Sequence, residues 1–273
     1  MRQLSGLVIS GRKLGQKIGF PTANLPLRKP LKIRRGVYTV LVTYNQQNYL
    51  GLAFYGQPQL VEVYLFNFKQ NLYGEKLIVK LLDLQRPPQR IKNLNQLSRL
   101  IKQDITKLND QVILVNKQDR IIGLETKLKA HQGRAKLHRA VSVQLFNHQG
   151  EWLLQQRSKA KLLFPLFWAN TVCTDVRSNE TYQQAAQRRL QEEFGLTAQL
   201  KPVFKFSYTA RWREYSEREI DQVFIGTVSG QPRPNPQEIN AWQFCCLDNW
   251  PQPLAPWFKL ILKKLSSSGI VKS

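Results

Sequence analysis

The chain contains 273 residues with a formal net charge of +23, because 41 Lys and Arg outnumber 18 Asp and Glu. Hydrophobic residues make up 42% of the sequence and aromatic residues 10%, which excludes a disordered chain. No apolar run reaches the roughly 18 residues of a membrane-spanning helix, and an odd number of cysteines argues against a disulfide framework. We therefore expect a cytoplasmic protein with no membrane partner and, from its length, two domains. The charge favours either a nucleic-acid partner or sites for phosphorylated small molecules.

The first half of the chain is rich in short runs of β-branched and aromatic residues. Four of these runs predict strands at 37–44, 49–54, 61–68 and 77–82. Apolar residues then recur at helical spacing, which predicts a helix over 93–108. These elements favour a small antiparallel barrel or sandwich that ends in a helix.

The second half mixes strand and helix patterns and begins near residue 112. A helix is predicted over 180–194, a proline-rich loop follows at 231–236, and Pro256 opens a last helix. Strands are predicted at 111–116, 140–146, 152–156, 204–209 and 220–228. This order indicates a mixed α/β domain, so we divide the chain into domains at 1–111 and 112–273.

Near the N-terminus, four regularly spaced glycines precede the string Phe20-Pro21-Thr22-Ala23-Asn24. Glycines let backbone N–H groups approach an anion closely, and the side chains of Thr22 and Asn24 offer oxygen ligands that suit Mg²⁺. The segment lacks the Gly-Lys-Ser/Thr of a P-loop. The spacing by itself is also typical of an ordinary glycine-rich turn.

This string, with 36–38, 61–68 and 72–74, resembles the riboflavin kinase domain over about residues 5–108. The resemblance implies a six-stranded antiparallel barrel that phosphorylates riboflavin to FMN with ATP. Thr22 and Asn24 would hold Mg·ATP, and Glu62 would accept a proton from the ribityl hydroxyl. The segments 56–59 and 85–91 depart from the family pattern, the second of them where the family covers the flavin. A barrel that binds flavin without catalysis, or has no catalytic role, is therefore an alternative.

A second group of chemistry-bearing residues begins with His131 and His138, which are two of the three histidines in the chain. Asp175 follows later, and Glu217 and Glu219 precede the strand predicted at 220–228. Alternation along an extended chain places both glutamates on one side, where they can face one cation. Such a His/carboxylate set favours Zn²⁺, Mn²⁺ or Fe²⁺ over Mg²⁺, although a lone histidine is more often structural.

Residues 187–196 resemble the Nudix helix, whose carboxylates bind Mg²⁺ beside a diphosphate. Nudix hydrolases have Arg-Glu where this chain has Arg188-Arg189. The resemblance therefore implies that a metal-binding carboxylate is missing at Arg189, which disfavours diphosphate hydrolysis.

Motifs spread over about 112–264 resemble type 1 isopentenyl-diphosphate isomerase, a non-hydrolytic Nudix branch; among them are 122–127, 137–140, 170–173 and 217–221. The resemblance implies an α/β/α sandwich with a mixed sheet, and so an α+β chain overall. It also implies conversion of isopentenyl diphosphate to dimethylallyl diphosphate. This allylic proton transfer passes through a carbocation and needs an acid, a base and exclusion of water.

The same resemblance implies catalytic roles for four side chains. Cys173 and Glu219 match the acid–base pair, and Tyr208 matches a tyrosine near the acid. Trp257 matches an indole that faces the carbocation through cation–π attraction. Basic residues around the diphosphate would be Lys127, Arg157, Lys161 and Arg189.

The implied metal ligands fall into two groups. Glu193 would help to hold a Mg²⁺ that bridges to the diphosphate. A Mn²⁺ or Zn²⁺ would be held by His131, His138, Asp175, Glu217 and Glu219. The family has histidine where this chain has Asp175, and we expect the aspartate to soften the preference for Zn²⁺ and Mn²⁺.

Two other interpretations of the second domain stay open at this point. A divergent Nudix protein could act on another diphosphate. The second interpretation is a basic protein that associates with nucleic acid. The sequence, however, contains no RNA-binding motif with interleaved aromatic residues.

Overall fold

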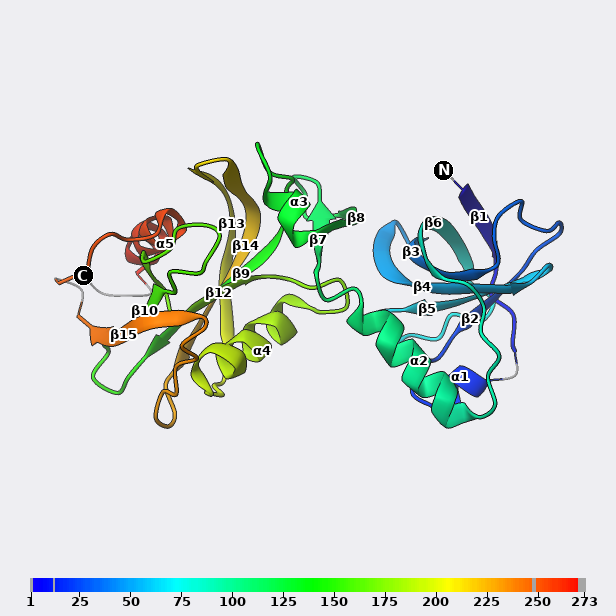
Figure 1. The fold of residues 1–273 in the computed structure, drawn as a ribbon, viewed down its shortest axis with the longest axis horizontal. Helices are drawn as coiled ribbons and strands as arrows, with labels where there is room; N and C mark the ends of the chain where they lie inside the picture. The colour runs from blue at the N-terminus through cyan, green and yellow to red at the C-terminus, as the bar shows by residue number, and fades with distance from the viewer. Residues whose placement is uncertain (1, 12, 247–248, 270–273) are drawn as a thin grey trace. The chain divides into compact units, whose positions relative to one another are not determined.

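The computed structural model describes residues 2–11, 13–246 and 249–269. The chain forms two compact units, the first made of Met1–Leu124 with Arg177–Asn179 and the second of Glu125–Val176 with Glu180–Ser273 (Figure 1). Within the described ranges, no helix is both long and apolar enough to cross a bilayer.

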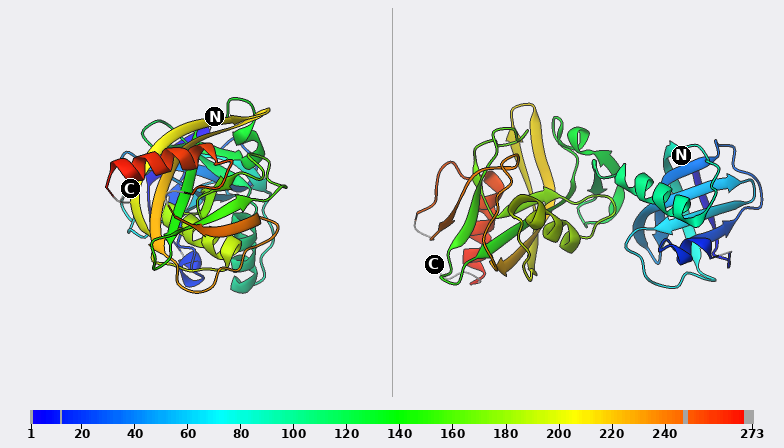
Figure 2. Two further views of the ribbon diagram at one scale, coloured as in Figure 1. Left: turned by 90° about the vertical axis from the view of Figure 1, so that its left-hand side faces the viewer. Right: turned by 60° about the horizontal axis from the view of Figure 1, so that its bottom comes forward.

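Six antiparallel strands form a nearly closed barrel in the first unit (Figures 1 and 2), in the order β1-β6-β3-β4-β5-β2. Their bounds are β1 (Arg2–Leu7), β2 (Ala23–Pro26), β3 (Gly36–Tyr44), β4 (Gln47–Gln57), β5 (Leu60–Leu65) and β6 (Lys76–Arg86). The two end strands approach each other where the Ile9 N–H donates to the Asn24 carbonyl at 2.9 Å. The predicted six-stranded antiparallel barrel is therefore confirmed.

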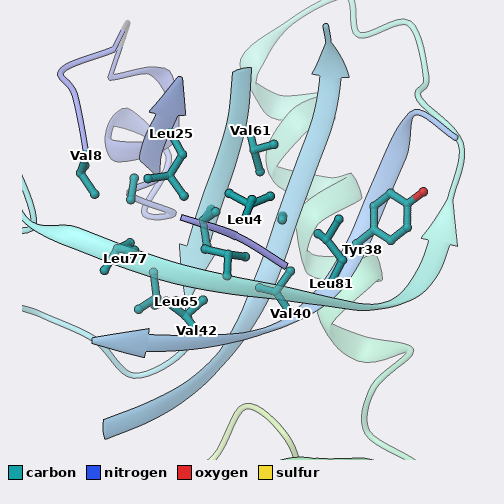
Figure 3. Close-up of a cluster of buried hydrophobic side chains, with 14 of the residues drawn as sticks. Leu4, Val8, Leu25, Tyr38, Val40, Val42, Val61, Leu65, Leu77 and Leu81 are labelled. Carbon is teal, nitrogen blue, oxygen red and sulfur yellow. The ribbon is translucent and has the colours of Figure 1, made fainter. Parts of the chain in front are cut away.

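Alternation along the strands separates the interior of the barrel from its outer face. In β5, Val61 and Val63 are fully buried in the core, whereas Glu62 between them is only partly buried. Figure 3 shows Val61 with Leu25 and Val40 among the side chains that fill the interior. Because adjacent strand residues point to opposite faces, Glu62 lies on the outer face of the barrel.

Two glycines of the N-terminal series allow close backbone approach. A Cβ atom on Gly11 would lie 2.2 Å from the Asn24 side-chain amide nitrogen, and one on Gly15 would lie 2.2 Å from the Phe20 carbonyl oxygen. Gly11 precedes the short helix α1 (Leu14–Lys17) and Gly15 lies within it, ahead of the turn before β2. The glycine spacing therefore reflects the tight path of this segment.

Helix α2 (Leu94–Thr106) follows the barrel and is tied to it by one buried ion pair. Asn93 caps the helix by accepting a hydrogen bond from the Gln96 N–H. The Arg86 Nε–H in β6 donates to both oxygens of Asp104, at 2.8 and 3.0 Å. Strands β7 (Gln111–Val115) and β8 (Ile121–Thr126) then pair with each other.

The second unit is built on a mixed sheet. Strand β9 (His138–Phe146) runs parallel to β14 (Tyr215–Thr227), which is antiparallel to β13 (Lys201–Trp212). Four shorter strands extend the sheet: β10 (Trp152–Arg157), β11 (Trp168–Ala169), β12 (Val172–Asp175) and β15 (Ile239–Cys245). Helices α4 (Tyr182–Phe194) and α5 (Pro256–Ser267) cover the sheet, and α3 (Lys127–His131) precedes it (Figure 2). The predicted α+β chain with a mixed second sheet is confirmed.

The predicted start of the strand at 220–228 is wrong. Glu217 and Glu219 are expected ahead of this strand, but β14 begins at Tyr215 and contains both residues. Strands β13 and β14 form a hairpin whose pairing extends to Trp212 and Tyr215. The polar residues that follow Tyr215 therefore belong to the sheet. Alternation within a strand therefore applies directly to the two glutamates.

Candidate active site

Three neighbouring strands bring the acidic and imidazole side chains together. Glu219 of β14 is the register partner of His138, the first residue of β9. On the other side of β9, strand β12 pairs Asp175 with Ala140. Since residues directly opposite one another share a face, the sheet register by itself places these side chains on one surface.

Both histidines are oriented by backbone carbonyls. The Nδ1 atom of His131 lies 2.8 Å from the Lys127 carbonyl oxygen, and that of His138 lies 2.7 Å from the Lys136 carbonyl oxygen. A carbonyl oxygen can only accept, so each Nδ1 carries the proton and each Nε2 faces the carboxylates. The Nε2 of His131 lies 2.9 Å from Glu217 Oε2.

The resulting donor set fits a divalent cation. The ligand atoms of four buried residues all lie within 4.8 Å of one another: His131, His138, Glu217 and Glu219. Two imidazole nitrogens with carboxylate oxygens suit Zn²⁺, Mn²⁺ or Fe²⁺. Asp175 adjoins this group, with Oδ1 3.0 Å from His138 Nε2 and 3.6 Å from His131 Nε2. Glu193, the other expected metal ligand, lies apart from the group on α4 and contacts Arg189.

Proximity drives the pKa values of these buried groups apart. Burial, assisted by the charge of Glu217, raises the pKa of Glu219 to about 8. Burial opposes ionisation of Glu217 as well, but its hydrogen bond with His131 prevails and lowers its pKa to about 2. Burial also opposes protonation of His131, yet the charge of Asp175 and the contact with Glu217 raise its pKa to about 9. The group therefore holds protons at neutral pH that a cation would displace.

Tyr208 and Cys173 complete the expected proton-transfer group. The Tyr208 hydroxyl donates to Glu219 Oε2 at 2.6 Å, and burial followed by the charge of Glu219 raises the pKa of the phenol. Cys173, on β12, receives a contact from Arg157 Nη1 at 3.4 Å. Desolvation raises the pKa of its thiol to about 12, so Cys173 is a neutral thiol at physiological pH.

Trp257 closes the site from α5. Its indole N–H donates to Asn170 Oδ1 at 3.1 Å, which fixes the ring orientation. The indole lines a cavity of about 100 Å³ that is also lined by Cys173, Tyr208 and Glu219. The structure therefore gathers the four expected catalytic side chains of the second unit around one small cavity.

The four expected diphosphate-binding residues line the same cavity: Lys127, Arg157, Lys161 and Arg189. Arg157 is fixed by the carbonyls of Leu163 and Phe164, to which its Nε–H donates at 3.2 and 3.1 Å. The guanidinium of Arg157 also lies 5.1 Å from the centre of the Trp257 ring. Positive charge is thus placed beside the cavity by backbone contacts and aromatic packing.

Helix α4 presents Arg189 and Glu193 one turn apart. The helix begins with a capping box between Thr181 and Gln184 and ends at Gly195, whose φ of 63° is left-handed. Glu193 is 1% exposed, and its Oε2 accepts from the side-chain amide of Gln155 at 2.7 Å.

Two residues near the site were missed in the sequence analysis. Glu238, which follows the proline-rich loop, bonds both to Lys161 and to Arg189, the latter at 2.9 Å. No local pattern in the sequence indicates this contact. Asp221 accepts from the Ser142 hydroxyl at 2.7 Å, and burial raises its pKa to about 7. The alternation that links Glu217 and Glu219 extends to Asp221 and could have identified it.

The expected site of the barrel lies on its outer face. Asn24 of β2 and Glu62 of β5 are register partners, so their side chains share that face. Thr22 lies just before β2 and lines a cleft of about 450 Å³ together with Gln16 and Lys69. The three expected residues therefore lie close along the chain and the sheet, although only Thr22 lines the cleft itself.

Comparison with known proteins agrees with both resemblances. The family model for riboflavin kinase matches residues 2–112, and the model for the NUDIX domain matches residues 136–265. Isopentenyl-diphosphate Delta-isomerase of Serratia proteamaculans is 35% identical over 169 residues, covering 59% of this chain and 94% of that protein. The enzyme of the same name from Halorhodospira halophila is 36% identical, covering 57% of this chain and 94% of that protein.

Among solved structures, the MutT NUDIX hydrolase of Burkholderia pseudomallei aligns with a TM-score of 0.43 at 21% identity, covering 48% of this chain and 98% of that one. Sequence identity above 30% over nearly the whole length of the two isomerases identifies the second unit. The chain belongs to the isopentenyl-diphosphate Delta-isomerase family, and its residues 2–112, on the N-terminal side of the NUDIX match, fit the riboflavin kinase family model.

Proposed function

We propose that the second unit converts isopentenyl diphosphate to dimethylallyl diphosphate by allylic proton transfer. The observation that carries the proposal is the shared cavity of about 100 Å³, into which Cys173, Glu219 and Trp257 are gathered. Two groups that can exchange a proton with carbon thus adjoin an aromatic face in a buried site. This combination suits proton transfer to and from carbon through a carbocation.

The chemistry requires one proton to enter and one to leave. One member of the Cys173–Glu219 pair adds a proton to the terminal alkene carbon, which leaves a tertiary carbocation at the neighbouring carbon. The other member removes an allylic proton, and the electrons of that C–H bond form the new double bond. The Tyr208 hydroxyl, 2.6 Å from Glu219 Oε2, holds that carboxyl in position.

Burial protects the carbocation from water. Trp257 is 2% exposed, and its indole π-face provides attraction for a cation without a nucleophilic atom. A Mn²⁺ or Zn²⁺ bound by His131, His138, Glu217 and Glu219 would supply positive charge that favours the ionised form of Glu219. Asp175 adds a third carboxylate beside these ligands.

The diphosphate is assigned to the basic side of the cavity. Lys127, Arg157, Lys161 and Arg189 would neutralise it, with Glu193 holding a Mg²⁺ that the diphosphate brings. Arg189 supports isomerisation over hydrolysis of the diphosphate. Its guanidinium bonds to the carboxylates of Glu192 and Glu193 on α4 and of Glu238 just before β15, so a cation stands where the hydrolases have a carboxylate.

For the barrel we propose phosphorylation of riboflavin to FMN by ATP. Support comes from the match to the riboflavin kinase family and from the pairing of Asn24 with Glu62 next to Thr22. Oxygen ligands from Thr22 and Asn24 suit a Mg·ATP complex, and Glu62 would accept the ribityl proton.

Replacement of the proton-transfer groups tests the isomerase. We expect Cys173→Ala and Glu219→Gln each to lower kcat for isopentenyl diphosphate by at least about 100-fold, since one of the two proton transfers is lost. Product formation measured by chromatography gives the rates. The matched control is Cys246→Ala, which removes an exposed cysteine and is expected to leave kcat unchanged. Near-normal turnover in Cys173→Ala would remove this residue from the mechanism.

Replacement of Glu62 tests the kinase. Glu62→Gln is expected to reduce FMN formation from riboflavin and ATP by about 100-fold, because the base is lost while the strand is retained. Fluorescence-detected chromatography separates the two flavins. Glu75→Gln, on an exposed carboxylate of the same unit, serves as the control for the change in charge. If Glu62→Gln forms FMN at the wild-type rate, another residue is the base.

Metal binding is expected to release protons. The pKa values of His131 and His138 are raised, and that of Glu219 is raised to about 8, so all three groups hold protons at pH 7 and must lose them to bind a cation. Binding of Mn²⁺ or Zn²⁺ should therefore release about two to three protons and weaken as the pH falls from 9 to 6. Calorimetry in buffers of different ionisation enthalpy counts the protons. An affinity independent of pH, with no proton release, contradicts this assignment.

A further inference from the structure

Asp175 connects the metal-ligand group to one of the diphosphate-binding cations. Its Oδ1 lies 3.0 Å from His138 Nε2, whereas its Oδ2 lies 2.8 Å from Lys127 Nζ. The carboxylate is 7% exposed, and the lysine side chain is 56% exposed and lines the cavity. One oxygen therefore faces the metal-ligand group, and the other faces a half-exposed lysine that lines the cavity.

Only certain side chains can make this connection. A carboxylate has two oxygens that both accept, so it can contact a metal ion and an ammonium group simultaneously. A histidine that binds a metal through one ring nitrogen carries a proton on the other, and that N–H cannot accept from a lysine. A histidine at position 175 would leave Lys127 without this partner.

We propose that Lys127 is shared between Asp175 and the diphosphate, and that Asp175 thereby couples metal binding to diphosphate binding. This inference rests on the metal and diphosphate sites of the proposed function. Without a metal ion, Asp175 holds Lys127, and an incoming diphosphate must draw the lysine away. When a cation binds at Oδ1, it reduces the negative charge available to Lys127 and releases it toward the diphosphate.

The surroundings of Lys127 are consistent with such sharing. The lysine is attracted mainly by Asp175 and more weakly by Glu217, while Arg189 repels it. Asp175 is therefore its dominant partner among the charged groups that face it. Because linkage is reciprocal, diphosphate binding must strengthen metal binding by the same factor by which the metal strengthens diphosphate binding.

The diphosphate side of the coupling is measured without metal. Pyrophosphate affinity is determined by calorimetry in EDTA for four proteins: the wild type, Asp175→Asn, Lys127→Met and the double variant. Asp175→Asn should bind pyrophosphate at least about fivefold tighter, because Lys127 is no longer held. In the Lys127→Met background, the same substitution should change the affinity by less than about twofold.

A control variant distinguishes release of Lys127 from a general effect of removing one negative charge. Glu214→Gln removes an exposed carboxylate elsewhere in the unit and should leave pyrophosphate affinity unchanged. An equal gain from Asp175→Asn with and without Lys127, or no gain at all, overturns the inference. Failure of every protein to bind pyrophosphate instead overturns the diphosphate site of the proposed function.

The metal side is measured without pyrophosphate, so that chelation in solution plays no part. Free Mn²⁺ is followed by electron paramagnetic resonance during titration. Lys127→Met should bind Mn²⁺ at least about fivefold tighter, because Asp175 is freed for the cation. In an Asp175→His background, the Lys127 substitution should have no effect. Unchanged Mn²⁺ affinity in Lys127→Met overturns the coupling. Because the Lys127 side chain is half-exposed, Lys127→Met should fold even if Asp175→Asn does not.

Discussion

The candidate site of the second unit depends on three buried carboxylates that lie against the imidazoles of His131 and His138. Isolated charges are costly to bury, so Asp175 and Glu217 need opposite charge beside them, whereas Glu219 is protonated at neutral pH. The protonated histidines provide some of that charge, and a divalent cation would provide it more compactly. The parallel pairing of β9 with β14 fixes this arrangement, because it sets His138 beside Glu219. The candidate chemistry therefore follows from strand register.

The same burial organises the surrounding cavity. It keeps Cys173 as a neutral thiol, holds a hydrogen bond between Tyr208 and Glu219, and encloses the indole of Trp257. Four basic side chains line the same cavity, and Glu238 contacts two of them, Lys161 and Arg189. A substrate with an apolar chain and a diphosphate matches a cavity that combines an indole with basic groups.

Part of this arrangement could be predicted from the sequence and part could not. Alternation correctly placed Glu217 and Glu219 on one face, because the period of a strand is fixed by backbone geometry. Strand β12, which carries Cys173 and Asp175, was not predicted, since four residues with mixed polarity give no periodic signal. The contacts of Asp175 with Lys127 and of Glu238 with Lys161 join residues far apart in sequence, and only tertiary packing reveals them. In the barrel, strand patterns alone predict four strands, and the resemblance to riboflavin kinase implies six. The glycine-rich first segment gives no strand pattern of its own.

The central claim is that the buried histidines and carboxylates form a metal site. Anomalous diffraction from a crystal soaked in Mn²⁺ tests it most directly. We expect one strong peak within about 2.0–2.3 Å of the His131 and His138 Nε2 atoms, in contact with oxygens of Glu217 and Glu219. A well-ordered map with no peak between these residues, or with Mn²⁺ only at other positions, would contradict it.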